Sequence, residues 1–280
     1  MKSCVVVPTN RPERIVQFIE AWQPQFHRAD VRLIVVEDDP QWTIKLPDWV
    51  EHCCHADITA DLKEKAECIP TRSGGVRDYG FWLAYRDKTI DIVISLDDDV
   101  LPLEGVDFLG EHWQALETPR NLKWWPLFPG FRLRGEPYNC EMVKPILNLG
   151  LWQGFPDVDA YQQLLDPDCE RTFAKYGFLG NGIVPPGFGF ACCGMNWACR
   201  REVVPFLYFP KLPEGMKRFD DIWAGLIFKR IADLFGWAIT YGTPLLKHDR
   251  GSSPLNNLRQ EMLGYSLNEQ MWQVLDMMPQ

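Results

Sequence analysis

Residues 90–99 read IDIVISLDDD, and this stretch decides the fold. The largely apolar run from Ile90 to Leu96 predicts a buried strand. Asp97, Asp98 and Asp99 follow it directly. Three adjacent carboxylates repel one another, so a fold that keeps them ionised and close needs a compensating cation. Because Mg²⁺ and Mn²⁺ prefer oxygen ligands and commonly join carboxylates to phosphates, the triplet predicts a metal site, the alternative being a solvated acidic loop.

The residues before this stretch repeat the pattern of a strand followed by a helix. Lys2–Val7 and Val31–Val36 are predicted strands, and Val76–Arg86 is a predicted helix. A helix is also expected between the first two strands, because apolar residues recur there at helical spacing: Ile15, Phe18, Ile19 and Trp22. This order predicts an α/β fold with a mostly parallel sheet wrapped by helices.

Polar clusters follow all three predicted strands. They are Thr9–Arg11, Glu37–Asp39 and the aspartate triplet. In parallel sheets of this kind, ligands bind at the carboxyl ends of the strands. The sequence therefore predicts a binding site where these three clusters meet.

The second half of the chain is less regular. Glycine and proline recur in residues 127–137 and 177–194, which predicts long loops, and a helix is expected from about Asp221 to Leu234. No repeat or linker divides the chain, so we expect one domain over residues 1–280. Its nucleotide-binding half is expected at 1–105 and its sugar or acceptor half at 106–280.

Two pairs of residues in this half are candidates for chemistry. Asp220 and Asp221 begin the predicted helix, where one aspartate is suited to cap the helix and its neighbour is then free to orient a sugar hydroxyl or accept a proton. His248 has a neutral imidazole suited to complete a metal site, and Arg250 has a planar fork suited to a diphosphate. The alternative for His248 is a packed or surface residue.

Composition excludes some classes of protein and favours others. The 280 residues carry a formal charge of -9, which argues against general nucleic-acid binding. No segment has the length needed to span a membrane, and the first apolar run is too short for a signal peptide. With nine cysteines and no export signal, we expect reduced thiols and a cytoplasmic protein. The run His52-Cys53-Cys54-His55 is too closely spaced for a typical zinc site.

Several ordered motifs resemble the plant reversibly glycosylated polypeptides, also known as UDP-arabinopyranose mutases. Four motifs in the first half resemble motifs of the family and occur in the same order. They are the opening strand, the acidic end of the second strand, Arg77-Asp78-Tyr79-Gly80 and the aspartate triplet. The more specific matches lie later in the chain: Gly150-Leu151-Trp152, Pro156-Asp157-Val158-Asp159-Ala160, Cys193-Gly194-Met195-Asn196-Trp197-Ala198, Arg218-Phe219-Asp220-Asp221-Ile222-Trp223-Ala224-Gly225, and His248 with Ser253-Pro254 and Asn257-Leu258.

The resemblance implies a glycosyltransferase A-type fold, a UDP-sugar ligand, and Mn²⁺ or Mg²⁺ as cofactor. It implies metal ligands at Asp97, Asp99 and His248, and catalytic roles for Arg134, Asp98, Asp220 and Asp221. Contacts with the nucleotide sugar are expected from Pro8, Thr9, Arg11, Asp38, Asp39, Arg77, Asp97, Trp152, Asn196 and Arg250.

Arg134 lies in Arg134-Gly135-Glu136-Pro137. From the residues alone, this arginine predicts a phosphate contact or a surface ion pair. The family resemblance implies that it is reversibly glycosylated, so that the sugar leaves UDP, rests on Arg134, changes ring size and returns. A second family arginine, seven residues later, is absent from Asn139-Cys140-Glu141.

Three functions therefore stay open. The first is a UDP-sugar mutase or self-glycosylating enzyme that uses Arg134. The second is a glycosyltransferase that passes the sugar to an external acceptor, whose identity the sequence does not give. The third is a non-catalytic subunit that binds nucleotide sugar and regulates a partner, and a homo- or hetero-oligomer is compatible with each.

Overall fold

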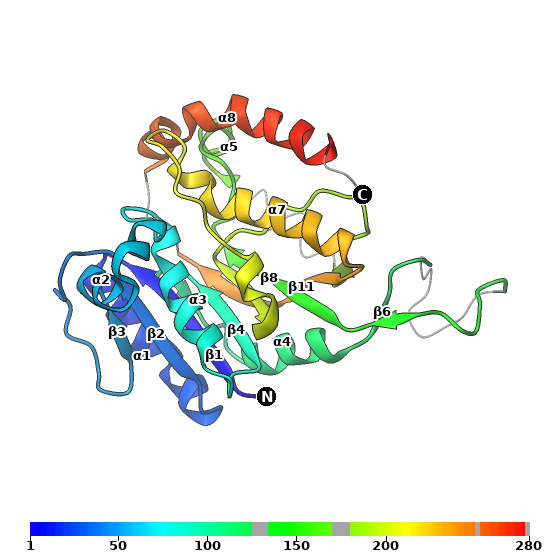
Figure 1. Ribbon diagram of the computed structural model, residues 1–280, viewed down its shortest axis with the longest axis horizontal. Coiled ribbons are helices and arrows are strands. Elements are labelled where there is room, and N and C mark those ends of the chain that lie inside the picture. The colour runs from blue at the N-terminus through cyan, green and yellow to red at the C-terminus, as the bar shows by residue number, and fades with distance from the viewer. Residues whose placement is uncertain (125–133, 170–179, 250–252, 278–280) are drawn as a thin grey trace.

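The computed structural model describes residues 1–124, 134–169, 180–249 and 253–277 (Figure 1). Its centre is a nine-stranded sheet with the order β3-β2-β1-β4-β10-β8-β11-β5, and β9 pairs with β11 outside this path. The strands of this sheet are β1 (Ser3–Thr9), β2 (Arg32–Glu37), β3 (Glu51–Cys53), β4 (Ile92–Leu96), β5 (Val100–Leu101), β8 (Pro145–Gly154), β9 (Gly182–Ile183), β10 (Asn196–Arg200) and β11 (Ala238–His248).

Most strands of this sheet point the same way. β1 is parallel to β2 and β4, β2 is parallel to β3, and β8 is parallel to β11. Because β10 is antiparallel to both β4 and β8, the β8–β11 pair runs in the direction of β1 and β4. β5 and β9 run against β11. The predicted mostly parallel sheet is confirmed, and six of its strands, β1, β2, β3, β4, β8 and β11, have their carboxyl ends along one edge.

Helices cover both faces of the sheet, as the α/β prediction requires (Figure 1). A Cβ on Gly80 would lie 2.4 Å from Val6 Cγ1, so the helix that carries Gly80 packs on the Val6 side of β1. Trp113, on another helix, donates a hydrogen bond of 2.8 Å from Nε1 to Ser3 Oγ of the same strand. Strand positions an odd number apart face opposite sides, so these two helices, α3 and α4, cover opposite faces. The helices are α1 (Pro12–Arg28), α2 (His55–Leu62), α3 (Arg77–Arg86), α4 (Phe108–Glu117), α5 (Ala160–Leu165), α7 (Asp220–Leu234) and α8 (Pro254–Met277), with 3-10 turns η1 (Lys63–Cys68), η2 (Gly74–Val76), η3 (Arg201–Phe206) and η4 (Lys217–Phe219).

The central strands are buried from both sides. Residues 5–7 of β1, 33–36 of β2 and 92–94 of β4 are at most 1% exposed. Continuous apolar runs of this kind are typical of strands that are covered on both faces. On the α4 side, the rings of Trp22 in α1 and Phe108 in α4 meet with centroids 4.7 Å apart. This packing fixes where the strands end, and so positions the polar residues that follow them.

The strands and helices expected in the first half are present. β1, β2 and β4 begin and end within two residues of the predictions. β1 continues beyond Val7 because Pro8 and Thr9 still pair with Val36 and Glu37 of β2. The helix expected at Val76–Arg86 is α3.

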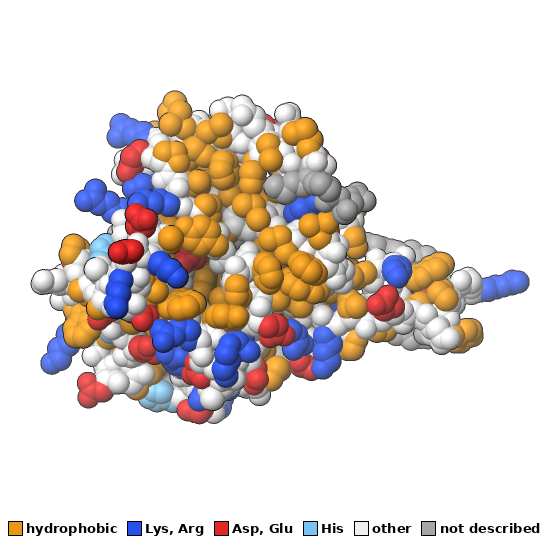
Figure 2. Space-filling view, in the orientation of Figure 1, with side chains coloured by type: hydrophobic (Ala, Val, Ile, Leu, Met, Phe, Trp, Pro, Cys, Tyr) orange, Lys and Arg blue, Asp and Glu red, His pale blue; other side chains and the backbone are white. Residues whose placement is uncertain are grey.

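α8 and α5 pack together at the end of the molecule drawn at the top of Figure 1. Leu255, Met262 and Leu263 of α8 are 58 to 64% exposed, and Figure 2 shows apolar side chains on this part of the surface. The helix therefore lacks a single buried apolar stripe, which is the pattern that predicts a helix from sequence. Among the described residues, no helix is both long and apolar enough to cross a membrane. The cytoplasmic location stays a prediction.

β6 (Arg120–Asn121) and β7 (Met142–Val143) form a two-stranded antiparallel ribbon outside the main sheet. In Figure 1 the described residues beside this ribbon extend away from the body of the molecule. Residues 125–133, between the two strands, lie outside the described residues.

Candidate active site

A pocket of about 470 Å³ opens at the carboxyl edge of the sheet. Its walls come from the residues that follow β1, β4 and β8, from the end of β11, from η2, η4 and the start of α7, and from α8. Eleven of the residues expected in the site line this one pocket: Pro8, Thr9, Arg11, Asp38, Arg77, Asp97, Asp98, Asp99, Asp220, Asp221 and His248.

Arg77 holds Asp97 from inside the protein. Its Nη2 lies 2.5 Å from Asp97 Oδ1, while Nε donates to the carbonyl oxygen of Gly74 at 2.9 Å. Nη1 donates to Ser95 Oγ and to the carbonyl oxygen of Gly194, both at 2.6 Å. Burial is the largest single influence on the pKa of Asp97 and raises it, but the charge and hydrogen bond of Arg77, together with the charges of His248 and Arg11, outweigh burial and lower the pKa. Arg77 therefore keeps Asp97 ionised, and all three of its guanidinium nitrogens have partners within the protein.

Asp98 ties the end of β4 to the end of β1. Its buried carboxylate, 3% exposed, accepts hydrogen bonds from Thr9 Oγ1 at 2.6 Å and Arg11 Nε at 3.2 Å. Arg11 Nη2 pairs with the other oxygen of Asp98 and lies 2.9 Å from Asp99 Oδ2. Burial raises the pKa of Asp98 more than these donors lower it. The contacts of Asp98 are thus to donors of the protein itself.

Asp99 and His248 present metal-binding atoms toward each other. Asp99 Oδ1 lies 4.0 Å from His248 Nε2, and His248 Nδ1 lies 2.7 Å from the carbonyl oxygen of Phe155. A carbonyl only accepts, so Nδ1 carries a proton, and in the neutral imidazole this leaves the lone pair on Nε2, as in many metal-ligating histidines. A carboxylate and a neutral imidazole are donors that a first-row divalent ion accepts, so this pair fits the expected metal. In the described parts of the chain, no three His, Cys, Asp or Glu side chains are grouped as a metal site, and the ion stays a prediction.

Asp220 and Asp221 hold backbone amides beside the pocket. The N-cap of α7 is Phe219, so the expectation that an aspartate caps this helix is wrong. Asp220 Oδ2 accepts the amide of Gly75 at 3.1 Å, and Asp221 Oδ2 accepts the amide of Gly194 at 2.9 Å. Burial, then the charge of Asp220, raises the pKa of Asp221 to about 7. Asp221 is therefore a carboxyl group that changes charge near neutral pH, as proton transfer requires.

The two histidines on either side of Cys53 and Cys54, in β3 and at the start of α2, contact the carboxylates at the end of β2. His52 Nε2 lies 2.7 Å from Glu37 Oε2, and His55 Nε2 lies 2.7 Å from Asp38 Oδ1. The other oxygen of Asp38 accepts the amide of Ser73 at 3.1 Å. His55 and this amide together fix the orientation of Asp38 in the pocket wall.

Asn196 does not line the pocket. It is fully buried, and its Nδ2 donates to the carbonyl oxygens of Leu151 at 2.8 Å and Pro244 at 3.1 Å. Its Oδ1 lies 3.2 Å from His112 Nε2. Asn196 therefore joins β10 to β8 and β11, and its contacts are structural in this arrangement.

Four other expected residues are not brought to the pocket. Trp152 does not line it, and Asp39 lines an adjoining cavity of about 660 Å³. Arg134 is exposed and belongs to the chain between β6 and β7. Arg250 lies outside the described residues.

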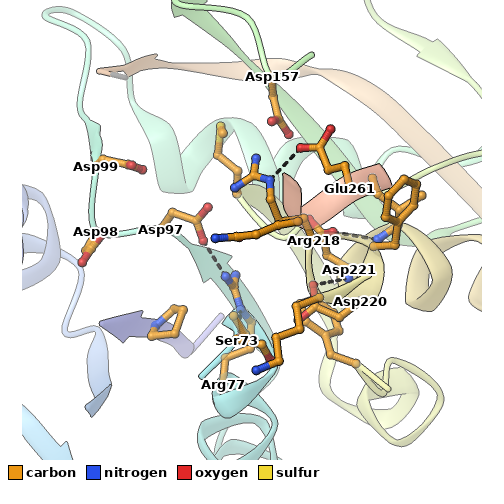
Figure 3. A pocket seen from close by; sticks show the side chains of 18 of the residues that line it. Ser73, Arg77, Asp97, Asp98, Asp99, Asp157, Arg218, Asp220, Asp221 and Glu261 are labelled. Carbon is orange, nitrogen blue, oxygen red and sulfur yellow. Dashed lines mark hydrogen bonds and ion pairs between the residues drawn. The ribbon is translucent and has the colours of Figure 1, made fainter. Parts of the chain in front are cut away.

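Asp157, Arg218 and Glu261 line the pocket but were not among the site residues expected from the sequence. Figure 3 shows the Asp157 carboxylate pointing into the pocket, and Arg218 Nε donates to Glu261 Oε1 at 2.7 Å. Asp157 and Arg218 lie in motifs that signal the family, which is a sequence signal for their importance. Glu261 lies in none of those motifs, and only the placement of α8 brings it to the site.

A family model described as reversibly glycosylated polypeptide matches residues 2–279. The chain belongs to the reversibly glycosylated polypeptide family. The probable UDP-arabinopyranose mutase 4 of Arabidopsis thaliana is 32% identical over 285 residues, which cover 95% of this chain and 75% of that protein. The probable UDP-arabinopyranose mutase 1 of Pisum sativum is 31% identical, with 95% and 75% covered, and UDP-arabinopyranose mutase 1 of Oryza sativa subsp. japonica is 30% identical, with 93% and 73% covered. These relatives are named as enzymes, and the prediction of an enzyme of this family is confirmed.

Solved structures that match this chain are more distant in sequence than these family members. Residues 1–349 of TarS from S. aureus are 15% identical, with 89% of this chain and 60% of that chain covered and a TM-score of 0.46. The catalytic domain of Drosophila beta1,4galactosyltransferase 7 is 12% identical, with 93% and 80% covered and a TM-score of 0.40.

The pocket of this family member is lined by both acidic and basic side chains. Asp97 and Asp99 lie on one side, and Asp220, Asp221 and Asp157 lie on the other (Figure 3). Basic residues also line it: Arg11, Arg72, Arg77, Lys217 and Arg218. Carboxylates suit a cation or sugar hydroxyls, and guanidinium groups suit phosphate oxygens. The arrangement is chemically suited to a ligand that has both phosphate and hydroxyl groups.

Proposed function

We propose that this chain is a metal-dependent enzyme that binds a UDP-sugar in the pocket and interconverts the pyranose and furanose forms of its arabinose. The observation that carries the proposal is the convergence of Asp97, Asp99, His248 and Asp221 on one pocket at the carboxyl edge of the sheet. Membership of the family supports the choice of substrate, because its named relatives are UDP-arabinopyranose mutases.

The aspartate triplet would receive the diphosphate end of the ligand. Asp99 and His248 are the residues that would hold Mn²⁺ or Mg²⁺, with Asp97 next to them, and the ion supplies positive charge to the diphosphate that leaves the sugar. Arg77 keeps Asp97 ionised, and Arg11 fixes Asp98 and Asp99 at the end of β1. In this proposal Asp98 acts by positioning its neighbours.

In this proposal the opposite wall of the pocket, with Asp220 and Asp221, binds the sugar and transfers its protons. A change from pyranose to furanose breaks the bond between C1 and one ring oxygen and forms a bond between C1 and another hydroxyl oxygen. One oxygen must gain a proton and the other must lose one. Asp221, with its pKa raised to about 7, is suited to move this proton, and Asp220 holds the amide of Gly75 beside it.

A second candidate function is transfer of the sugar to an external acceptor. Arg134 is exposed in the chain between β6 and β7 and does not line the pocket, which favours this alternative. In the mutase proposal, Arg134 is the residue on which the sugar rests, as the family resemblance implies. The role of Arg134 therefore distinguishes the two functions.

The test is incubation of the protein with UDP-arabinopyranose and Mn²⁺, followed by separation of the nucleotide sugars and mass spectrometry of the protein. The mutase proposal predicts UDP-arabinofuranose, together with protein that carries one pentose. It also predicts that Arg134→Ala lowers furanose formation by about 1000-fold or more, since a covalent step is lost.

Arg28→Ala is the matched control, because Arg28 is also an exposed arginine and does not line the pocket. It should keep the activity of the wild type. Slow release of free arabinose, with no furanose and no labelled protein, would favour the transferase. A wild-type protein that neither binds nor alters UDP-arabinopyranose, UDP-glucose or UDP-galactose would refute both functions.

A further inference from the structure

Glu261 is a buried carboxylate on the C-terminal helix that faces the pocket. It is 4% exposed, and its Oε2 accepts the amide of Ala160 and the hydroxyl of Tyr265, both at 2.8 Å. Its Oε1 accepts Nε of Arg218 at 2.7 Å. Both carboxylate oxygens are therefore occupied, and three elements, α5, α8 and η4, determine where this carboxylate lies.

Arg218 is held by one nitrogen and presents the others. Among the described residues, Nε is the Arg218 nitrogen that has a hydrogen-bond partner. The N–H groups of both Nη atoms therefore have no acceptor within this part of the chain. The side chain is 35% exposed and lines the pocket. Figure 3 shows it reaching across the pocket, with Glu261 on one side and Asp97 on the other.

The other two buried or half-buried guanidinium groups of the pocket are used differently. Arg77 has protein partners on all three of its nitrogens. Arg11 pairs through Nε and Nη2 with Asp98 and Asp99. Arg218 thus has an oriented fork of two Nη groups without hydrogen-bond partners among the described residues, and this geometry matches two oxygens of a phosphate.

We infer that Arg218 binds the diphosphate of the ligand across the pocket from the aspartate triplet, and that Glu261 is the positioning residue that aims its guanidinium. This inference rests on the proposed function. It makes α8 a part of the binding site, because the helix supplies the carboxylate that fixes Arg218. The group recognised is the second phosphate, so the contact is made with UDP and is missing with UMP.

The test is calorimetric binding of UDP and UMP, each at a fixed Mn²⁺ concentration, to the wild type and to variants. Arg218→Gln should weaken UDP binding by about 10- to 100-fold, the effect of one lost charge-assisted contact, and UMP binding by less than about threefold. Arg218→Lys keeps the charge but not the fork, and should recover only part of the loss.

Glu261→Ala separates positioning from simple charge. Removal of a negative charge strengthens anion binding by Coulomb attraction alone. If Glu261 positions Arg218, the variant instead binds UDP about 5- to 10-fold more weakly and leaves UMP nearly unchanged. Should Glu261→Ala fail to fold, Tyr265→Phe removes one hydrogen bond to Glu261 and should weaken UDP binding about two- to threefold.

Glu117→Ala is the matched control, because it breaks a glutamate–arginine pair of 2.8 Å, with Arg200, outside the pocket. It should leave both affinities unchanged. Equal UDP affinity in the wild type and Arg218→Gln, or equal losses for UDP and UMP, would overturn the contact with the second phosphate. Equal or tighter UDP binding by Glu261→Ala would overturn the positioning role. A wild type that binds no UDP would instead refute the proposed function.

Discussion

At the scale of single residues, three adjacent aspartates have three different sets of contacts. Asp97 pairs with the buried guanidinium of Arg77, Asp98 is buried against β1, and Asp99 lies between Arg11 and His248. Three like charges are thereby kept close, because Arg77 offsets the charge of Asp97 and Arg11 offsets the charges of Asp98 and Asp99. The sequence predicts that compensation is needed. It does not predict that arginines of the protein supply a large part of it.

The raised pKa of Asp221 predicts a specific dependence of stability on pH. Its pKa is about 7 in the folded protein and about 3.9 when unfolded, so between these values the folded state binds more protons. The stability contributed by the protonated carboxyl is present below about pH 4 and is lost as the pH rises toward 7. As the pH rises from about 4 to 7, the free energy of unfolding of the wild type should therefore fall relative to that of Asp221→Asn, by up to about 1.4 kcal/mol per pH unit.

Urea denaturation of both proteins at pH 5, 6, 7 and 8 measures this difference. Asp48→Asn is the control, since Asp48 is an exposed carboxylate outside the pocket, and its difference from the wild type should be the same at every pH. A difference between the wild type and Asp221→Asn that is flat from pH 5 to 7 would contradict the environment described for Asp221.

The site was predictable from sequence where residues follow a strand or lie in a family motif. The polar clusters that follow β1, β2 and β4 lie together in the site, because parallel strands have their carboxyl ends at the same edge of a sheet. Asn196 was expected to contact the ligand because it lies in a motif, but a motif does not distinguish a ligand contact from a structural contact. Glu261 carries no motif, and its role depends on how α8 packs against Arg218.

At the scale of elements, the close contact of α3 with β1 predicts a strict size limit at Gly80. A methyl group there would lie 2.4 Å from Val6 Cγ1 and 3.2 Å from Val36 Cγ2, on two buried strands. Alanine in place of glycine stabilises a helix by about 1 kcal/mol, whereas overpacking a core costs about 1–3 kcal/mol. We expect overpacking to win, so that Gly80→Ala lowers the free energy of unfolding by about 1–2 kcal/mol.

Thermal and urea unfolding of Gly80→Ala test this limit. Gln17→Ala, on the exposed face of α1, is the helical control and should stay within about 0.5 kcal/mol of the wild type. A Gly80→Ala protein that is more stable than the wild type would show that helix propensity, and not packing, dominates at this position.

The elements themselves were predictable to different degrees. β1, β2 and β4 are continuous apolar runs, and α7 has an apolar face, so each has a pattern of its own. α8 exposes Leu255, Met262 and Leu263, and no apolar stripe marks it. β8, β10 and β11 follow long loops, and their order in the sheet depends on contacts between distant residues that a local pattern does not contain.

At the scale of the whole molecule, the pocket exists because the chain returns to the same sheet edge several times. Thr9, Asp97, Asp157 and His248 are up to 239 residues apart and line one cavity, because β1, β4, β8 and β11 run in the same direction. No single segment forms the site. Ligand binding should therefore stabilise the whole fold, because it joins residues from both ends of the chain.

The most direct test of this account is the melting temperature of the protein with UDP-arabinopyranose, measured with Mn²⁺ and with EDTA. A ligand at about 100 times its Kd adds about 2.7 kcal/mol to the free energy of unfolding. We therefore predict that UDP-arabinopyranose raises the melting temperature by roughly 5–10 °C in Mn²⁺ and does not raise it in EDTA. Asp99→Ala should abolish the rise, whereas Asp61→Ala, which breaks the surface pair with Arg86 outside the pocket, should keep it. The same rise in EDTA, or in Asp99→Ala, would contradict a metal-dependent UDP-sugar site at the end of β4.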